Sequence, residues 1–278
     1  MKTPIESSRS ETVWHLRLAY HGGAYCGWQI QPGQPTVQEE LQRRLRKLFR
    51  DDTINVHATS RTDTGVHALD QNTSFKAVSF CRPPHTPVRL QRLLNRWLPA
   101  DIRVTEAGLE APDFHARYSA VAKAYTYVFE LGEIHSPFSA SYSWQIDTEL
   151  DVEKMRRVAR MLAGKHDFSG FSANPRRPME SKVREIYRCE IIEANNRLYL
   201  NVIGNGFLYK MVRSLAGFLA EAGRGQKCRP EDCQKILAAG SRPPTVKTAP
   251  PQGLFLARVF YDQQQWLDYR PVLPPFSV

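Results

Sequence analysis

The order of hydrophobic patterns along the chain is the feature that most constrains its fold. Residues 13–20, "VWHLRLAY", alternate apolar and polar side chains, which is typical of a strand with one buried face. The first part of the chain continues with a helix pattern at 36–49, strand patterns at 53–59 and 72–80, a helix pattern at 86–98 and a strand pattern at 102–111. This β-α-β-β-α-β order predicts an α+β sandwich of the ferredoxin or RRM type.

The second part of the chain looks like a variation on the first. It carries a strand pattern at 124–131, a helix pattern at 151–164, a hairpin from 181–194 to 197–205, helix patterns at 206–223 and 230–240, and a strand pattern at 253–261. We therefore expect an α+β fold of two ferredoxin-like halves with mainly antiparallel sheets. The expected division is a flexible arm at 1–12, an N-terminal domain at 13–118 and a C-terminal domain at 119–278. A central basic cleft between the halves is the natural place for an active site.

Composition excludes several classes of protein. No run of about 18 apolar residues is present, and the N-terminus lacks the apolar region of a secretory signal. The five cysteines are odd in number and scattered, so they do not form a disulfide framework. Cys228 and Cys233 have no histidine nearby, which disfavours a zinc site. We expect a cytoplasmic protein in a reducing compartment.

The formal net charge of +10 favours a polyanionic partner. Lysine and arginine crowd three segments, 43–50, 89–96 and 156–160, and aromatic rings lie close to basic residues in "KAYTYVF" and "FLYKMVR". Basic surface combined with stacking rings is how proteins hold RNA. A surface that is merely basic and solvated is the alternative, so RNA binding is a hypothesis at this point.

The segment 60–71, "SRTDTGVHALDQ", holds a lone carboxylate, Asp63, among residues that suit chemistry. Asp63 can be a turn residue beside Gly65, a metal ligand, or an ionised carboxylate held by an arginine and used as a nucleophile or base. The metal interpretation lacks a second acidic group at usable spacing. His67 is either a second catalytic group or a packed structural residue. No Gly-x-Ser-x-Gly elbow is present, so a serine-hydrolase triad is unsupported.

This segment resembles the signature loop of the TruA family of pseudouridine synthases, G-R-T-D-A-G-V-H-A. Five further blocks resemble that family in the same order: "AYHGGAYCGWQIQPGQPTVQEELQ", "FHARYSAVAKAYTYVF", "GKHDFSGFS", "GNGFLYKMVRSLAG" and "APPQGLFLARVFY". Ser60 and Thr64 depart from the motif, where glycine and alanine are usual, and Ser60 cannot reach a positive φ cheaply. The segment "KAYTY" carries fewer positive charges than the usual R-R-Y-R-Y. None of these changes removes a catalytic group.

The resemblance implies a role for each candidate site residue. Asp63 is the catalytic carboxylate, which attacks the nucleotide or abstracts a sugar proton. Arg213 pairs with Asp63, and a two-contact pair would lock its geometry. Tyr125 stacks on the target uracil, Leu254 forms an apolar wall opposite that ring, and Arg61 fills the gap left by the displaced base.

The resemblance also implies the reaction and the partners. Uridine is isomerised to pseudouridine in the anticodon stem-loop of tRNA, at positions 38–40, without a metal or other cofactor, by a homodimer. A catalytically silent tRNA-binding or chaperone protein is the alternative; loss of Asp63, Tyr125 or Arg213 would have favoured it, and all three are present. A nucleotide hydrolase would need a phosphate-binding loop such as Gly-x-x-x-x-Gly-Lys-Ser/Thr, which the sequence lacks.

Overall fold

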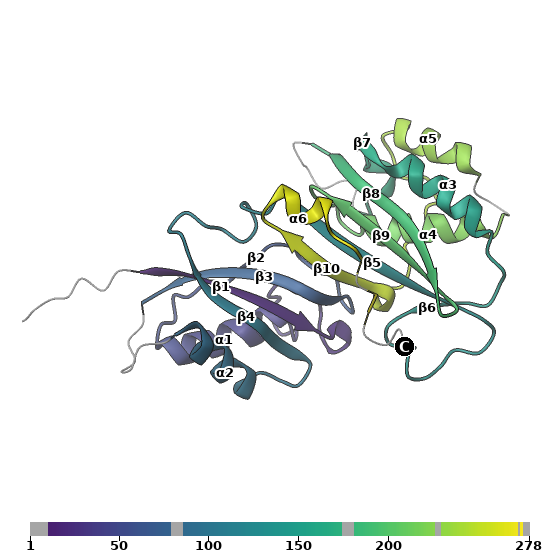
Figure 1. Cartoon of the computed structure of the whole chain (residues 1–278). Coiled ribbons are helices and arrows are strands. Elements are labelled where there is room, and N and C mark those ends of the chain that lie inside the picture. Colours follow the sequence, from purple (N-terminus) through teal and green to yellow (C-terminus); the bar gives the residue numbers. More distant parts are fainter. Residues whose placement is uncertain (1–10, 79–85, 174–180, 226–228, 272, 275–278) are drawn as a thin grey trace, which may run out of the picture.

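The computed structural model describes residues 11–78, 86–173, 181–225, 229–271 and 273–274 (Figure 1). Most of the expected arm at 1–12 therefore lies outside the described residues. The described chain builds one sheet of ten strands with the order β4-β1-β3-β10-β5-β9-β8-β7, while β2 pairs with β3 and β6 pairs with β5. The fold is α+β and mostly antiparallel, as predicted. The sheets of the two halves are continuous with each other.

The first half has the predicted β-α-β-β-α-β order. Its elements are β1 (Thr12–Tyr20), the 3-10 turn η1 (Gly22–Ala24), α1 (Val37–Phe49), β2 (His57–Ala58), β3 (His67–Ala77), α2 (Pro87–Trp97) and β4 (Ile102–Glu110). Its strands lie in the order β4-β1-β3-β2, and all these pairs are antiparallel.

The second half repeats this arrangement. Its elements are β5 (Ala122–Leu131), β6 (Trp144–Ile146), α3 (Val152–Leu162), β7 (Gly164–Asp167), η2 (Ser169–Phe171), β8 (Val183–Ala194), β9 (Arg197–Gly204), α4 (Met211–Gly223), α5 (Pro230–Ala238), η3 (Pro251–Gly253), β10 (Leu254–Phe260) and α6 (Gln263–Leu267). The order β10-β5-β9-β8 matches β4-β1-β3-β2 strand for strand. The short elements β6, β7 and α6 were not predicted.

Local sequence signals explain where several elements begin and turn. The Thr86 side chain accepts a hydrogen bond from the Arg89 N–H, and the Asp151 side chain accepts one from the Lys154 N–H, so α2 and α3 both start at an N-cap residue. Asn195 and Asn196 have φ values of 51° and 59°, which the two-residue hairpin between β8 and β9 requires.

One apolar core runs through both halves on the helix-bearing side of the sheet. In the first half, Trp14 of β1 packs edge to face against Phe49 of α1, with ring centroids 5.5 Å apart. In the second half, Tyr127 and Phe129 of β5 belong to the same buried cluster as Phe218 of α4. The intervening β5 residue Val128 belongs to a separate cluster. Alternate side chains of β5 therefore face opposite sides, and Tyr125 shares the helix-bearing side with Tyr127.

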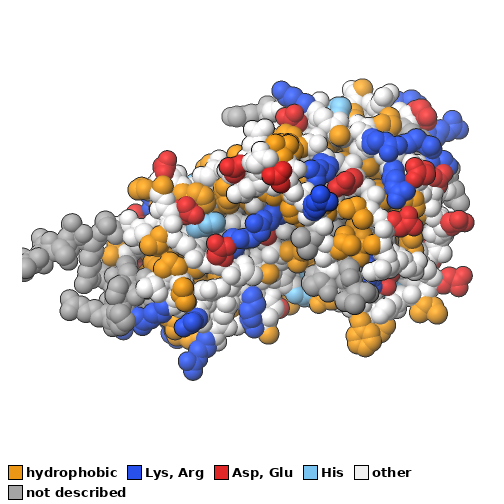
Figure 2. Space-filling model, in the orientation of Figure 1, with side chains coloured by type: hydrophobic (Ala, Val, Ile, Leu, Met, Phe, Trp, Pro, Cys, Tyr) orange, Lys and Arg blue, Asp and Glu red, His pale blue; other side chains and the backbone are white. Residues whose placement is uncertain are grey.

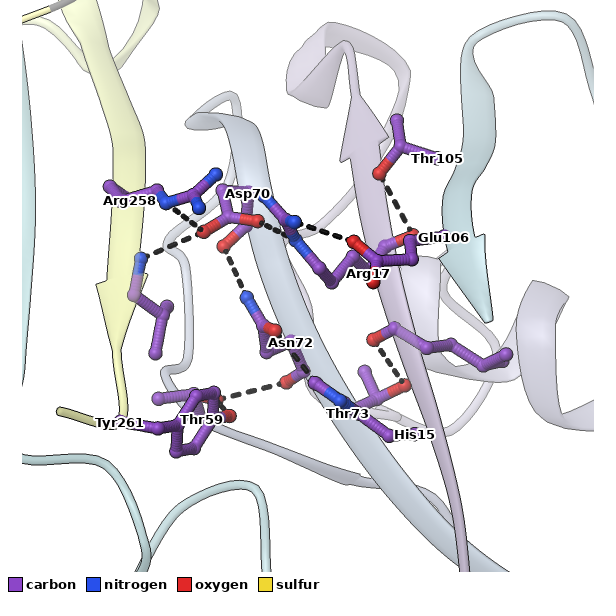
Figure 3. Close-up of polar contacts among 12 residues, drawn as sticks. His15, Arg17, Thr59, Asp70, Asn72, Thr73, Thr105, Glu106, Arg258 and Tyr261 are labelled. Atoms are coloured by element: carbon purple, nitrogen blue, oxygen red, sulfur yellow. Dashed lines mark hydrogen bonds and ion pairs between the residues drawn. The ribbon is translucent and has the colours of Figure 1, made fainter. Parts of the chain in front are cut away.

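The two halves join along one edge of β3. Thr73 and Ser74 of that strand pair with β2, whereas His67 and Ala68 pair with β10 in parallel. Asp70 lies between these two pairings and is buried. Its carboxylate accepts hydrogen bonds from Arg17 Nε of β1 at 2.8 Å and from the Val259 N–H of β10, also at 2.8 Å (Figure 3). A single carboxylate thus links strands from both halves.

The basic segments found in the sequence are partly neutralised in the structure. Arg43 and Arg44 of α1 both pair with Glu40, and Arg156 of α3 pairs with Glu153 at 2.6 Å. Figure 2 shows acidic side chains among the lysines and arginines that lie over α3 and α5. The crowding of arginine in the sequence therefore overstates the free positive charge on these helices. In the described part of the chain, no helix is long and apolar enough to cross a membrane.

Candidate active site

Asp63 lies in the connection between β2 and β3, at the junction of the two halves. The Val66 N–H donates a hydrogen bond to the Asp63 carbonyl at 3.1 Å, and Gly65 has φ +77°, so residues 63–66 form a tight turn. The end of the predicted loop motif, from His67 onward, is already part of β3. The turn interpretation of Asp63 is therefore correct for its backbone. The turn is closed by the Asp63 carbonyl and does not use its carboxylate.

The glycine-rich segment after β1 forms the support on which this loop rests. Gly27 has φ +85°, and a side chain there would overlap the carbonyl oxygen of Thr62. A side chain at Gly22 would overlap the carbonyl oxygen of Val66. The Trp28 N–H donates to the Thr62 carbonyl at 3.1 Å. Sequence reasoning assigned no role to these glycines; their role is close backbone contact on either side of Asp63.

Arg213 of α4 donates a hydrogen bond from Nη1 to Asp63 Oδ2 at 2.9 Å. The side chains are 11% and 20% exposed, so this ion pair is largely withdrawn from water. Arg213 Nε donates to the Ala249 carbonyl at 2.8 Å, and the Ala249 N–H donates to the Arg213 carbonyl at 3.0 Å. The structure shows one hydrogen bond between Arg213 and Asp63 instead of the expected two, and the Nε donor, which a side-on two-contact pair would use, bonds to Ala249. The bond from Nε to Ala249 restricts the orientation of the guanidinium.

A glycine on α4 permits this arrangement. A side chain at Gly217 would overlap the carbonyl oxygen of Lys247, so the segment 247–249 lies directly against the helix. Gly217 lies one helical turn after Arg213 and faces the same segment. The close approach explains how Ala249 reaches both the backbone and the side chain of Arg213.

Tyr125 of β5 lies beside the Asp63 loop. Its ring packs edge to face against Phe207, with centroids 5.0 Å apart, and its hydroxyl lies 2.8 Å from Ser60 Oγ. Burial, opposed by the Ser60 hydrogen bond and reinforced by the nearby Asp63 carboxylate, raises the pKa of Tyr125 to about 12. The Tyr125 hydroxyl therefore keeps its proton at neutral pH and is available as a donor.

The other two predicted site residues are less closely engaged. Leu254 opens β10, is 6% exposed, and lies opposite Tyr127 in the strand register, two residues from Tyr125. Arg61 is exposed, and its side chain makes no hydrogen bond or ion pair to the described residues. The structure thus brings Asp63, Arg213 and Tyr125 together, leaves Leu254 in the adjacent wall, and turns Arg61 toward solvent.

His67 is packed and structural. It is 2% exposed, its Nδ1 accepts a hydrogen bond from the Gly22 N–H at 3.1 Å, and its Nε2 donates to the carbonyls of Ser141 and Gln252 at 3.0 and 3.1 Å. Burial, reinforced by the neighbouring His21, lowers the pKa of His67 to about 4. Both ring nitrogens of the neutral imidazole are engaged, so the geometry supports the structural interpretation over the catalytic one.

Metal ligation was one interpretation of Asp63. Among the described residues, no three His, Cys, Asp or Glu side chains gather in a group that could hold a metal ion. The possible zinc pair involves Cys228, which lies outside the described residues, and Cys233, which is buried and unpaired.

The chain is similar to known proteins over most of its length. A family model described as tRNA pseudouridine synthase matches residues 18–119 and 158–262. The tRNA pseudouridine synthase A of Syntrophotalea carbinolica is 39% identical over 258 residues, which cover 92% of this chain and 99% of that protein. The enzyme of the same name from Bacillus pumilus is 41% identical over 247 residues, covering 88% and 97%. The chain therefore belongs to the tRNA pseudouridine synthase family.

Proposed function

We propose that this protein isomerises uridine to pseudouridine in tRNA, with Asp63 as the catalytic carboxylate. The observation that carries the proposal is the Asp63–Arg213 ion pair of 2.9 Å, assembled from both halves of the chain beside the protonated hydroxyl of Tyr125. Family membership supplies the reaction class, and this cluster supplies groups suited to it.

The reaction explains why one carboxylate suffices. The C–N glycosidic bond breaks, the uracil turns, and the base is rejoined to the sugar through carbon. A carboxylate can assist by attacking the nucleotide or by removing a proton from the sugar, and the substrate's own ring and sugar provide the remaining groups. Arg213 fixes the direction of the Asp63 carboxylate and offsets the charge of a group that lies mostly out of water.

The other site residues have proposed roles in holding the nucleotide. The ring of Tyr125 stacks on the target uracil, and Leu254 forms the apolar wall next to it. A base inside a stem must leave its stack, which costs a few kcal/mol. Arg61 points to solvent with its donors free, which suits a residue that enters the gap left by the base. Phosphate contacts to the basic surface repay the cost.

The proposed substrate is the anticodon stem-loop, at positions 38–40, and the proposed assembly is a homodimer with one tRNA across both subunits. We propose that the protein works in the cytoplasm. We further propose the division into an N-terminal domain at 13–118, which supplies Asp63, and a C-terminal domain at 119–278, which supplies Arg213 and Tyr125. The proposed active-site cleft lies between their helix layers.

Mapping of pseudouridine tests the function. An unmodified tRNA transcript with uridine at positions 38–40 is incubated with the protein in the presence of EDTA, and carbodiimide-dependent reverse-transcription stops locate pseudouridine. A transcript with cytidine at those positions is the control. We expect stops at the uridines only. Tight, salt-sensitive tRNA binding without any stop would contradict the proposal and favour the binding-only alternative.

A further inference from the structure

Ser60 connects the Asp63 loop to the other half of the molecule through a side chain. Its Oγ lies 2.8 Å from the hydroxyl of Tyr125, which belongs to β5 of the second half. Lys123, two residues earlier on the same face of β5, donates from Nζ to the carbonyl of Thr59 at 2.9 Å. Two successive side chains on this face of β5 therefore contact residues 59 and 60, which lie four and three positions before Asp63.

The position of Ser60 is itself fixed. Gln71 is fully buried, and its amide accepts a hydrogen bond from the Ser60 N–H at 3.3 Å and donates one to the Ser60 carbonyl at 2.6 Å. Ser60 is not among the described residues with positive φ, so a side chain is accommodated there without backbone strain. A residue held at both backbone groups presents its hydroxyl from a nearly fixed point.

Tyr125, by contrast, has few constraints on its polar end. Its ring packs against Phe207, and among the described residues Ser60 is the only hydrogen-bond partner of its hydroxyl. Burial keeps that hydroxyl protonated, so the two hydroxyls share a hydrogen bond in which one donates and the other accepts. Among the described residues, the Ser60 bond is therefore the one polar contact that holds the phenol hydroxyl beside Asp63.

We propose that Ser60 is a positioning residue for Tyr125, holding the phenol in place across the junction of the two halves. The inference rests on the proposed function, because it concerns the ring on which the target uracil stacks. It also gives a purpose to one departure of this chain from the motif that it resembles. Thr64, the other departure, is exposed and makes no side-chain hydrogen bond to the described residues, so it provides a matched control in the same loop.

A double-mutant cycle tests the proposal with the full-length protein. Single-turnover rates of pseudouridine formation and tRNA dissociation constants are measured for the wild type, Ser60→Ala, Tyr125→Phe and the double variant. We expect Ser60→Ala to lower the rate about 3- to 10-fold, the size expected for one hydrogen bond, with tRNA affinity unchanged. In the Tyr125→Phe background Ser60→Ala should have no further effect. Thr64→Ala should match the wild type.

Two results would overturn the proposal: a Ser60→Ala rate equal to that of the wild type, or the same fall in rate in both backgrounds, which would mean that Ser60 supports the loop independently of Tyr125. If the wild type forms no pseudouridine, the proposed function fails first. Thermal unfolding of the same four proteins then tests the Ser60–Tyr125 contact without an activity measurement. A fall in Tm on Ser60→Ala that disappears in the Tyr125→Phe background supports the Ser60–Tyr125 link, and equal falls contradict it.

Discussion

The two halves of this molecule share the order of their four main strands and differ sharply in the length of one of them. The second strand of the first half, β2, has two residues, whereas its counterpart β8 has twelve. The long β8 pairs along β9 and is itself bordered by β7. The short β2 covers only part of the edge of β3, and β10 pairs with His67 and Ala68 at the start of that edge. Truncation of one strand is thus what allows two sheets to become one.

The shortness of β2 also determines where Asp63 lies. In the second half, β8 and β9 are joined by a tight turn at Asn195 and Asn196. In the first half, the equivalent connection runs from residue 59 to residue 66 and carries Asp63. This longer loop lies where β10 joins β3, within reach of Arg213 and Tyr125 from the other half. Because Asp63 comes from the first half and Arg213 and Tyr125 from the second, the site exists only while the halves are joined.

Loss of Arg213, which joins the second half to the Asp63 loop of the first, should have the largest effect on activity. Arg213→Met removes the only cation that pairs with Asp63 among the described residues, and we expect pseudouridine formation to fall about 100-fold or more, since breaking a largely buried ion pair leaves an uncompensated charge. Single-turnover kinetics measure the effect. Arg224→Met, at the end of the same helix, is the matched control and should retain activity. Equal activities for the two variants would contradict the account.

Gly27→Ala tests the support beneath the Asp63 loop. The new methyl group would overlap the Thr62 carbonyl oxygen at a residue with φ +85°. We expect the free energy of unfolding to fall by about 2–4 kcal/mol. Gly33→Ala is the matched control, because Gly33 also has a positive φ but nothing within 4 Å of an added Cβ; its cost should be about 1 kcal/mol. Urea denaturation separates the two, and equal losses would show that the close contact does not matter.

The burial of His67 at the junction predicts a pH dependence of stability. His67 begins β3, stacks on Phe255 of β10, and has its pKa lowered to about 4. Between about pH 6.5 and pH 4 the unfolded chain binds a proton that the folded His67 does not, so stability falls as the pH falls through this window, by up to about 3 kcal/mol from this group. His67→Gln should show a smaller fall over the same window in thermal unfolding. An unchanged pH profile would rule out His67 as the source.

Asp70 should contribute a smaller effect at the same junction. Asp70→Asn weakens the bonds to Arg17 and to the Val259 N–H, and we expect a loss of about 1–2 kcal/mol in the free energy of unfolding. Glu106→Gln removes the exposed partner of the same arginine and should cost less than about 1 kcal/mol. A larger loss for Glu106→Gln, measured by urea denaturation, would mean that Asp70 does not hold the halves together.

Much of the fold could be predicted because its signals are local. Apolar periodicity gave the order of the main elements, and Thr86 and Asp151 marked helix starts through their own side chains. Periodicity failed where conformation depends on context. The helical pattern begins at residue 206, but α4 begins at Met211, because Lys210 adopts a left-handed conformation with φ 55°. The short β6, β7 and α6 have too few residues to show a period.

Less of the candidate site than of the fold could be predicted from the sequence. Residue chemistry alone left three interpretations of Asp63, and the pairing with Arg213, 150 residues away, was expected only from the resemblance. The support from Gly22 and Gly27 and the Ser60–Tyr125 bond depend on how separate backbones pack, which no local pattern reports. The glycine-rich composition of the segment after β1 was the one available signal for that support.

The most direct test of the central claim is the single-turnover rate of Asp63→Asn on an unmodified tRNA, with tRNA affinity measured in parallel. The account predicts a fall in rate of at least ~10³-fold with nearly unchanged affinity, because the amide keeps the shape of the side chain and removes its charge. A rate within about 10-fold of the wild type would contradict the account and would place the chemistry on another group.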